Sequence, residues 1–320
     1  MGAKFRWGSG RTAFVRWAMG ACAIATFASD AWAGPAAACD RDCLARIAGD
    51  YQAALIAHRP AALPLTPDVR FTENGVALAP GDALWATASG IAHAGPIVID
   101  SESHSVALLA TVSEGSRSAL LAARITMRGR RIAAIETIVA RPESATFLRP
   151  DGFGQPGADG SAGTRAALRA AAQKYFDGLV RPGMLVPPFS EDCQRVENGA
   201  RTTNNSDPLP GVTPLPLNPA MTALSCDEQF RRGLLRFVSK VRELRYPVID
   251  VRQGLVLAIG VFDHDGVGRA AAPGQAVSKT LQSPFSFAVA ELFTIRDGRI
   301  AHIEALLTDL PYGMSMPWPK

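Results

Sequence analysis

Residues 126–136 read TMRGRRIAAIE and residues 294–304 read TIRDGRIAHIE, so seven of eleven positions agree at a spacing of 168 residues (294 − 126). In both stretches β-prone residues flank a short turn that contains Gly and Arg. This pattern is typical of a β-hairpin. A block repeated at such a distance indicates that the chain arose by duplication of one unit.

A second pair of matching blocks lies earlier in the chain. Tyr51 precedes Tyr175 by 124 residues (175 − 51), and the tripeptide Glu-Asn-Gly occurs at 73–75 and again at 197–199. The spacing then grows by 44 (168 − 124), so the second copy carries an insertion of about that size. Residues 200–226 are rich in Pro, Asn and Thr, which indicates that they form part of this insertion as a loop.

These repeats predict the domain organisation. We expect a signal peptide over 1–33, a first domain over 34–148, a Gly/Pro-rich linker over 149–163, and a second domain over 164–320 with an inserted loop near 200–226. In each copy helical patterns precede alternating β patterns, so the fold class is α+β. In the second copy Thr164 could cap the first helix, and residues 226–241 are expected to form a later one. The prediction is two tandem domains, each with N-terminal helices packed on a curved antiparallel sheet.

The N-terminus has the features of a secretory leader. A basic start is followed by an apolar run that ends in Ala31-Trp32-Ala33, an A-x-A cleavage signal, and adjacent arginines are absent, which favours the general secretory route. Loss of residues 1–33 removes four basic residues and Asp30, so the net charge falls by three, from +4 to +1. We therefore expect a periplasmic or secreted protein without nucleic-acid or membrane partners. A buried N-terminal helix or a membrane anchor is the alternative.

Four cysteines remain after the leader: Cys39, Cys43, Cys193 and Cys226. An even number in an oxidising compartment favours disulfides, and three pairings are open. The preferred pairing is Cys193–Cys226, which would close the inserted loop, together with Cys39–Cys43 at the start of the first helix. No CxxC pair is present, so metal binding by these cysteines is not expected.

Three stretches carry a family resemblance: KYFDGLV (174–180), EDCQRVENG (191–199) and FTIRDGRIAHIEALL (293–307). Their order resembles the nuclear-transport-factor-2-like superfamily, which includes ketosteroid isomerases and SnoaL-like cyclases. The resemblance covers both copies and implies that a bent sheet and a few helices form a cone around an apolar pocket. The closing PYGMSMPW (311–318) resembles the ending of a secreted group of double-domain SnoaL-like proteins.

The resemblance also implies site residues. In ketosteroid isomerases a Tyr of the first helix donates a hydrogen bond to the substrate oxygen and an Asp moves the proton; Tyr175 and Glu197 match these positions, 22 residues apart (197 − 175). Tyr51 and Glu73 have the same spacing in the first copy, where we expect them to bind substrate. The departures are that the acid is Glu and that no second oxyanion donor, an Asp on a later strand, can be found.

Further candidates come from the second copy. His264 is the nearest substitute for the absent donor. His302 has no counterpart in the first copy, where Ala134 takes its place, and with Glu304 it alternates onto one strand face that could line the cone. Tyr312 and Trp318 could wall an apolar pocket. Each candidate has a structural alternative: a core tyrosine or tryptophan, a solvated turn at His264, or turn chemistry at Glu-Asn-Gly.

A structural role is also open for Glu197. This glutamate could form an ion pair with Arg195 or Arg201 instead of acting on a substrate.

The favoured function is a cofactor-independent lyase or isomerase acting on a small apolar substrate that carries an oxygen, including aromatic or polycyclic compounds. Glu197 or His264 would abstract a proton beside that oxygen, and Tyr175 would stabilise the resulting oxyanion. The alternative is a non-catalytic module that binds a small apolar molecule. No phosphate-binding, dinucleotide-binding or zinc-protease motif occurs. We expect the two copies to pack as an internal pseudo-dimer, and homo-oligomers are a further expectation.

Overall fold

The computed structural model describes residues 38–143, 149–155, 163–206, 219–267 and 283–318, together with Gly2. Except for Gly2, the expected signal peptide lies outside these residues, as do parts of the expected linker and inserted loop. No helix within the described ranges has the length and apolar character needed to cross a membrane.

The N-terminal half, here the described residues between 38 and 143, begins with a long helix and continues into strands. Its elements are α1 (Arg41–Ile56), η1 (Pro60–Ala62), β1 (Leu65–Glu73), β2 (Val76–Leu78), α2 (Leu84–Thr87), β3 (Gly90–Asp100), β4 (Ser105–Glu114), β5 (Arg117–Arg128) and β6 (Arg131–Ala140). A short turn, η2 (Pro150–Gly152), follows this half.

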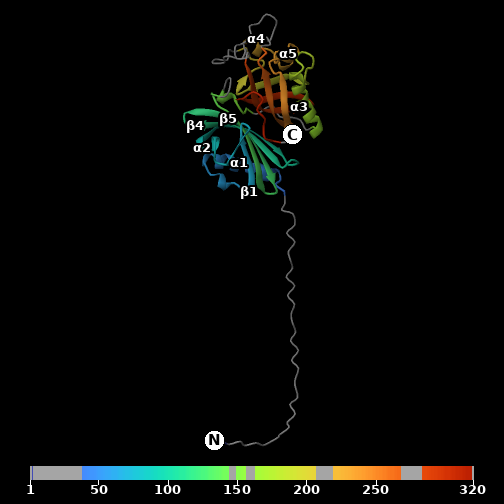
Figure 1. The fold of residues 1–320 in the computed structure, drawn as a ribbon. Coiled ribbons are helices and arrows are strands. Elements are labelled where there is room, and N and C mark those ends of the chain that lie inside the picture. The colour runs from blue at the N-terminus through green and yellow to red at the C-terminus, as the bar shows by residue number, and fades with distance from the viewer. Residues whose placement is uncertain are drawn as a thin grey trace, which may run out of the picture. The chain divides into compact units, whose positions relative to one another are not determined.

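The C-terminal half, here the described residues between 163 and 318, repeats the order with two additional short helices. Its elements are α3 (Arg165–Leu179), β7 (Phe189–Glu197), β8 (Ala200–Arg201), α4 (Pro219–Thr222), α5 (Cys226–Arg231), β9 (Lys240–Asp250), β10 (Leu255–Asp265), β11 (Pro284–Arg296) and β12 (Arg299–Leu310). Figure 1 shows the two halves in sequence colours, blue to green and yellow to red.

Each half forms one six-stranded sheet, and the two sheets have the same strand order. The orders are β2-β1-β6-β5-β4-β3 and β8-β7-β12-β11-β10-β9. In each sheet the first long strand pairs in parallel with the last, β1 with β6 and β7 with β12, and the other pairs are antiparallel. The fold is therefore α+β with two sheets of equal topology, and the repeated hairpins of the sequence are β5–β6 and β11–β12.

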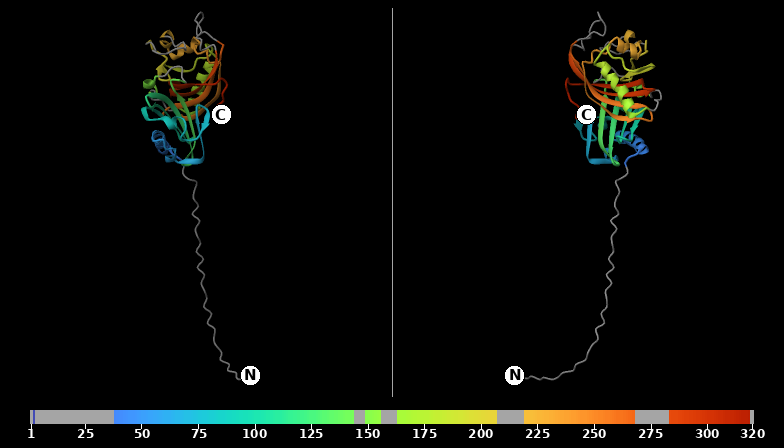
Figure 2. Two further views of the ribbon diagram at one scale, coloured as in Figure 1. Left: turned by 60° about the vertical axis from the view of Figure 1, so that its left-hand side comes forward. Right: turned by 90° about the vertical axis from the view of Figure 1, so that its right-hand side faces the viewer.

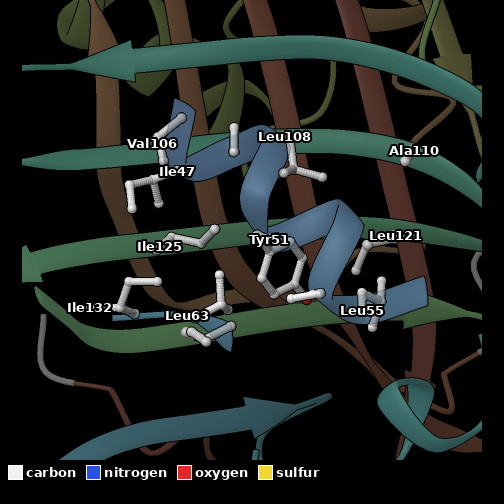
Figure 3. Close-up of a cluster of buried hydrophobic side chains, with 14 of the residues drawn as sticks. Ile47, Tyr51, Leu55, Leu63, Val106, Leu108, Ala110, Leu121, Ile125 and Ile132 are labelled. Atoms are coloured by element: carbon white, nitrogen blue, oxygen red, sulfur yellow. The ribbon is translucent and has the colours of Figure 1, made fainter. Parts of the chain in front are cut away.

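Local signals explain where the first helix begins. The Asp40 side chain accepts a hydrogen bond from the Cys43 backbone N–H at 2.9 Å, which caps α1. The Cys39–Cys43 disulfide links the residues on either side of this cap. Apolar side chains recur at helical spacing and face the sheet, and Figure 3 shows Tyr51 among them, above the strands.

A side-chain cap also begins the first helix of the C-terminal half, but a later helix is shorter than expected. Thr164 caps α3, as the sequence predicts, by accepting a hydrogen bond from the Ala167 N–H at 3.2 Å. A long helix was expected over 226–241, but α5 ends at Arg231. Gly233 takes a positive φ of 62°, which an α-helix cannot contain, so the chain leaves the helix there. The Cys193–Cys226 disulfide ties α5 to β7.

Each sheet has one face on its own helix and the other on the opposite sheet. Buried apolar residues form one cluster under α1, one under α3, and a third that contains members of both sheets, among them Leu109, Leu120, Leu257 and Leu306. Because side chains alternate along a strand, one face of each sheet fills its own core and the other fills the shared core. Figure 2 shows α3 lying against the orange and red strands of its sheet.

Two ion pairs cross between the halves in a reciprocal arrangement. Arg41, the first residue of α1, binds Asp250 at the end of β9 at 2.7 and 3.1 Å. Arg165, the first residue of α3, binds Asp100 at the end of β3 at 2.8 and 2.9 Å. Each aspartate also accepts a hydrogen bond from the backbone N–H beside the other aspartate. Such reciprocity is the property of an interface with two-fold symmetry.

The repeated Glu-Asn-Gly has a structural role in both halves. Asn74 takes a positive φ and its side chain bonds the backbone N–H and C=O of Val139 on β6, at 2.8 and 3.0 Å. Asn198 does the same with Leu307 on β12, at 2.9 Å for both bonds. The motif therefore extends the parallel strand pair by one residue after the first strand has ended.

Each of the two glycines of this motif packs against a segment that follows the sheet of the other half. Gly75, at a φ of 79°, packs against Met314 and Met316 near the C-terminus. Gly199, also at 79°, packs against the backbone around Arg149, whose N–H donates to the Asn198 carbonyl at 2.7 Å. The segment of Met314 and Met316 thus covers the turn between β1 and β2, and the segment around Arg149 covers the turn between β7 and β8. We call this arrangement the tail exchange.

Candidate functional site

A cavity lies on the helix-covered face of the C-terminal sheet. Its volume is about 30 Å³, room for about two water-sized spheres. Most of its wall is apolar. The lining residues are Tyr175, Leu179, Glu197, Asn198, Leu235, Phe237, Val238, Phe262, Phe287, Glu291 and Leu307.

Two glutamates face this cavity from the same cross-strand row. Glu197 on β7 is paired with Ala305 on β12, and Ala305 is paired with Glu291 on β11. Two strand spacings separate the backbones of the glutamates by about 10 Å. Both carboxyl groups line the same small, mostly apolar cavity.

Glu291 is the more deeply buried of the two acids, with 2% of its surface exposed. Its Oε1 accepts a hydrogen bond from the Tyr175 hydroxyl at 3.1 Å, and its Oε2 is buried without a hydrogen-bond partner among the described residues. Burial raises the pKa of Glu291 to about 8 because the charged form is poorly solvated there. At neutral pH most molecules therefore carry a protonated Glu291.

Arg195 sets the environment of the other acid. Its guanidinium lies 2.9 Å from Glu197 Oε1 and donates to Thr202 Oγ1 at 3.2 Å. Burial alone would lower the pKa of Arg195, but Glu197, Tyr175 and Glu291 together outweigh burial and raise it. Arg195 therefore stays charged in the core and neutralises Glu197. This ion pair is the structural alternative that the sequence left open for Glu197.

Tyr175 is hydrogen-bonded to one of the two acids, Glu291. Burial, and after it the charge of Glu291, raise the pKa of the Tyr175 hydroxyl well above its usual value, so the group remains protonated. Its hydrogen points to Glu291, not to Glu197 or into the hollow. Tyr175 therefore positions Glu291.

The N-terminal half lacks this arrangement. Glu73 lies in a row with Thr137 and Ala123, so an alanine stands where the C-terminal half has Glu291. The Glu73 carboxylate is bound to Arg141 at 2.9 Å and to the Leu84 N–H at 3.0 Å. Burial and the Glu73 charge raise the pKa of Tyr51, whose ring packs edge-on against Trp85. These expected substrate-binding residues are thus engaged in core and ion-pair contacts.

The two predicted histidines do not join the cavity. His264 lies two residues beyond Phe262 on the same face of β10, but its Nδ1 bonds the Phe237 carbonyl at 2.7 Å and its ring packs against Phe285. His302 was expected to line the cone and instead lies on the opposite face of β12. It approaches Glu304 at 3.5 Å, and Glu304 accepts from the Gly154 N–H at 3.2 Å. Alternation along β12 puts these two with Leu306 in the shared core.

The two aromatic candidates near the C-terminus, Tyr312 and Trp318, do not line the cavity either. The Trp318 indole N–H donates to Thr72 Oγ1 at 2.9 Å, and the guanidinium groups of Arg70 and Arg124 lie over its ring. Trp318 is therefore part of the tail exchange. Tyr312 is 53% exposed at the surface. The prediction that these residues wall the pocket is wrong for the observed cavity.

Glu291 is the residue that sequence reasoning missed. It stands alone among apolar neighbours in FAVAELFTI (287–295), and a single acid inside such a strand is a signal of a buried functional group. Among the residues that the structure describes, no three His, Cys, Asp or Glu side chains gather closely enough to hold a metal ion.

Part of the chain matches one family model, and the description of that family assigns it no function. Residues 161–307 match a family described as "Domain of unknown function (DUF8021)". No curated protein sequence matches the chain.

Three solved structures are similar to about a third of the chain. They are AclR, a putative hydroxylase from Streptomyces galilaeus (13% identity, 32% of this chain and 82% of that chain, TM-score 0.27); an NTF-2 like protein of unknown function from Burkholderia xenovorans LB400 (14%, 32% and 86%, 0.27); and a steroid delta-isomerase from Pseudomonas aeruginosa (17%, 31% and 81%, 0.26). Likenesses of this size carry no argument about function, which rests on the side chains of the cavity.

Proposed function

We propose that the C-terminal half is a cofactor-independent lyase or isomerase that acts by acid–base catalysis on a small, mostly apolar molecule carrying an oxygen. The observation that carries this proposal is Glu291, a buried carboxyl group with a raised pKa whose Oε2 has no hydrogen-bond partner among the described residues, in the same cavity as the ion-paired Glu197. A buried acid that holds its proton and a second acid that is paired with an arginine are suited to opposite roles in proton transfer.

The roles follow from the surroundings of each acid. Glu197, paired with Arg195, accepts a proton from the carbon α to the substrate carbonyl. Glu291, protonated and positioned by Tyr175, donates its Oε2 hydrogen to the carbonyl oxygen, which stabilises the developing negative charge. Glu197 then returns its proton, either to a β-hydroxyl group, which leaves as water, or to the far carbon of a migrating double bond, and the substrate oxygen returns its hydrogen to Glu291.

We extend the proposal to the domain architecture of the chain and to its export. Two sheets of identical strand order, each with a helix on one face, support two tandem nuclear-transport-factor-2-like domains. The reciprocal Arg–Asp pairs support an internal pseudo-dimer. Two disulfides support export to an oxidising compartment.

Turnover tests the proposal. A panel of small β-hydroxy ketones and enones is offered to the wild type, and loss of water or double-bond migration is followed by absorbance. We expect Glu291→Gln and Glu197→Gln to lower kcat by about 10² to 10⁴. Glu73→Gln, the matching change in the N-terminal half, should leave kcat unchanged. A Glu291→Gln variant with full turnover would refute the assigned roles.

A binding module without catalysis is the second candidate, and two contacts favour it. Glu197 is neutralised by Arg195, and the Tyr175 hydrogen is used by Glu291. Such a module would bind the panel compounds and release them unchanged.

The pH dependence of stability tests the state of Glu291 without a substrate. Its pKa rises from 4.5 in an unfolded chain to about 8 in the folded protein, so between these values the folded protein holds a proton that the unfolded chain has released. The free energy of unfolding of the wild type should therefore fall relative to Glu291→Gln as the pH rises from about 5 to about 8. The relative fall is up to about 1.4 kcal/mol per pH unit.

Urea unfolding at several pH values measures this difference. Other titrating groups are present in both proteins, so their contributions cancel. Curves that stay parallel over the whole range would show that Glu291 ionises with an ordinary pKa.

A further inference from the structure

We propose that the N-terminal half binds a tetrahedral dianion, the chemistry of a phosphate or sulfate group, at a cluster of charged side chains that we call the arginine site. The cluster consists of Arg70, Arg124, Arg245 and Glu136. It lies between the two sheets, whereas the cavity of the proposed function lies on the face of its sheet that α3 covers. The inference therefore stands whether or not that cavity is catalytic.

The strand register gathers these side chains on one face of the N-terminal sheet. Arg124 on β5 is paired with Glu136 on β6. Arg70 on β1 is paired with Ala134, two positions earlier on β6, so its side chain points to the same face. Arg245 on β9 reaches Glu136 from the opposite sheet at 2.9 Å. Ala134 and Arg124 are partly exposed and Arg70 is exposed, so a solute can reach this face.

The arginine site carries more positive than negative charge. Arg124 Nε donates to Glu136 Oε2 at 3.0 Å, and Arg245 Nη1 donates to the same oxygen at 2.9 Å. Among the described residues, no second carboxylate lies within ion-pair distance of the three guanidinium groups. Three positive charges therefore stand against one negative charge, and the surplus of two matches a dianion.

This surplus acts on side chains that are largely shielded from water. The side chain of Arg124 is 12% exposed and that of Arg245 is 7% exposed. Burial lowers the pKa of the Arg124 guanidinium, and the charges of Arg245 and Arg70 lower it further, so the single Glu136 carboxylate does not offset these effects. A bound anion would offset them, because a buried cation is stabilised by an opposite charge.

Each of the three guanidinium groups has N–H groups left for a ligand. Arg245 Nε is buried and has no hydrogen-bond partner among the described residues. Arg124 donates through Nε and Nη1, and Arg70 donates through Nη2 to the Pro317 carbonyl. A guanidinium group carries five N–H bonds, and these form strong charge-assisted hydrogen bonds with phosphate oxygens.

Trp318 keeps two of the guanidinium groups close together. The central carbons of Arg70 and Arg124 lie 4.4 and 4.8 Å from the centroid of its ring, so the two carbons are separated by no more than the sum of these distances. A phosphate group offers acceptor oxygens in several directions and can accept from two guanidinium groups at once, whereas a carboxylate offers its oxygens in one plane. The geometry therefore favours phosphate or sulfate over a carboxylate.

The C-terminal half lacks these arginines at the matching positions. By register, Arg70, Ala134, Arg124 and Glu136 correspond to Gln194, His302, Leu292 and Glu304. Inheritance from one ancestral domain therefore does not by itself account for the two arginines of the N-terminal sheet. The same comparison supplies residues that this fold accepts at both arginine positions.

Titration of inorganic phosphate into the full mature chain tests the inference. Binding is measured by calorimetry at about pH 7.5, where phosphate is mostly the dianion, with sulfate, acetate and chloride compared at equal ionic strength. We expect phosphate and sulfate to bind at least about tenfold more tightly than acetate or chloride and to raise the temperature of thermal unfolding. Acetate or chloride that binds as tightly as phosphate would overturn the dianion class.

Two variants carry the residues of the C-terminal half, Arg70→Gln and Arg124→Leu. Each removes one of the three guanidinium groups and should weaken phosphate binding about tenfold or more. Arg70 is exposed, so Arg70→Gln retains the fold even if the more buried Arg124→Leu does not. Phosphate binding that is unchanged in Arg70→Gln would overturn the site.

Arg128→Gln is the matched control. Arg128 is an exposed arginine of the same strand as Arg124, and it pairs with Asp68 outside the arginine site. Its replacement removes the same charge and should change the phosphate affinity by less than about twofold. An equal loss of affinity in Arg128→Gln and Arg70→Gln would show that net charge alone attracts the ion, and would refute a specific site.

Discussion

Replacement of Arg195 by Met is expected to lower the free energy of unfolding by about 3 to 5 kcal/mol, because it leaves the Glu197 carboxylate without a counter-charge inside the core. The Arg195 side chain is 2% exposed and that of Glu197 is 16% exposed, so little water can replace the lost partner. Urea unfolding at pH 7 measures the change. An apolar residue is compatible with this position, since the register places Phe71 at the equivalent site of the N-terminal half.

The matched control is the double variant Arg195→Met, Glu197→Leu. Removing both charges removes the uncompensated carboxylate, so most of the lost stability should return. A single variant within about 1 kcal/mol of the wild type would show that the pair is solvated. It would also remove the basis for an ionised Glu197 facing a neutral Glu291.

Replacement of Trp318 by Ala is the second change with a large expected effect, a loss of about 3 to 5 kcal/mol. The indole is 8% exposed, donates to Thr72 at 2.9 Å, and lies under the guanidinium groups of Arg70 and Arg124 at 4.4 and 4.8 Å from its centroid. Truncation removes the packing, the hydrogen bond and both cation–π contacts together. Thermal unfolding and urea titration measure the loss.

Tyr312→Ala provides the control within the same segment. Tyr312 is 53% exposed, so this change should alter stability by no more than about 0.5 kcal/mol. Similar effects for the two substitutions would contradict the assignment of Trp318 to the tail exchange. Because Trp318 does not line the cavity, turnover of the ketone and enone panel by the folded Trp318→Ala protein should match that of the wild type.

Much of the fold could be predicted because its signals are local. The repeated hairpins stand in matching copies, the Thr164 cap and the Cys39–Cys43 disulfide join residues close in sequence, and the Cys193–Cys226 disulfide follows from the inserted loop that it closes. The length of α5 could not be predicted as well, since the apolar spacing continues past Gly233 while the backbone leaves the helix at that residue.

The site was less predictable because it depends on register. Glu197 and Glu291 are 94 residues apart (291 − 197) and meet only because each is paired with Ala305. No spacing in the sequence specifies that row. The face of His302 depends in the same way on the register of β12, and its neighbour Glu304 is engaged in the shared core. The family resemblance pointed to Tyr175 and Glu197, which both line the cavity, but a comparison between the copies could not reveal an acid that the first copy lacks.

The tail exchange has a consequence for how the protein is made. A ribosome releases the chain from its N-terminus, so the first sheet is complete long before Met316 and Trp318 emerge. Until then Gly75 and Thr72 lack the segment that covers them, and the earliest half to be synthesised is the last to be finished. Loss of the residues from Met314 onward would therefore expose β1 and β2 of the N-terminal half, which are encoded far from the missing segment. Protease treatment of chains stalled before Met314 would reveal this exposure.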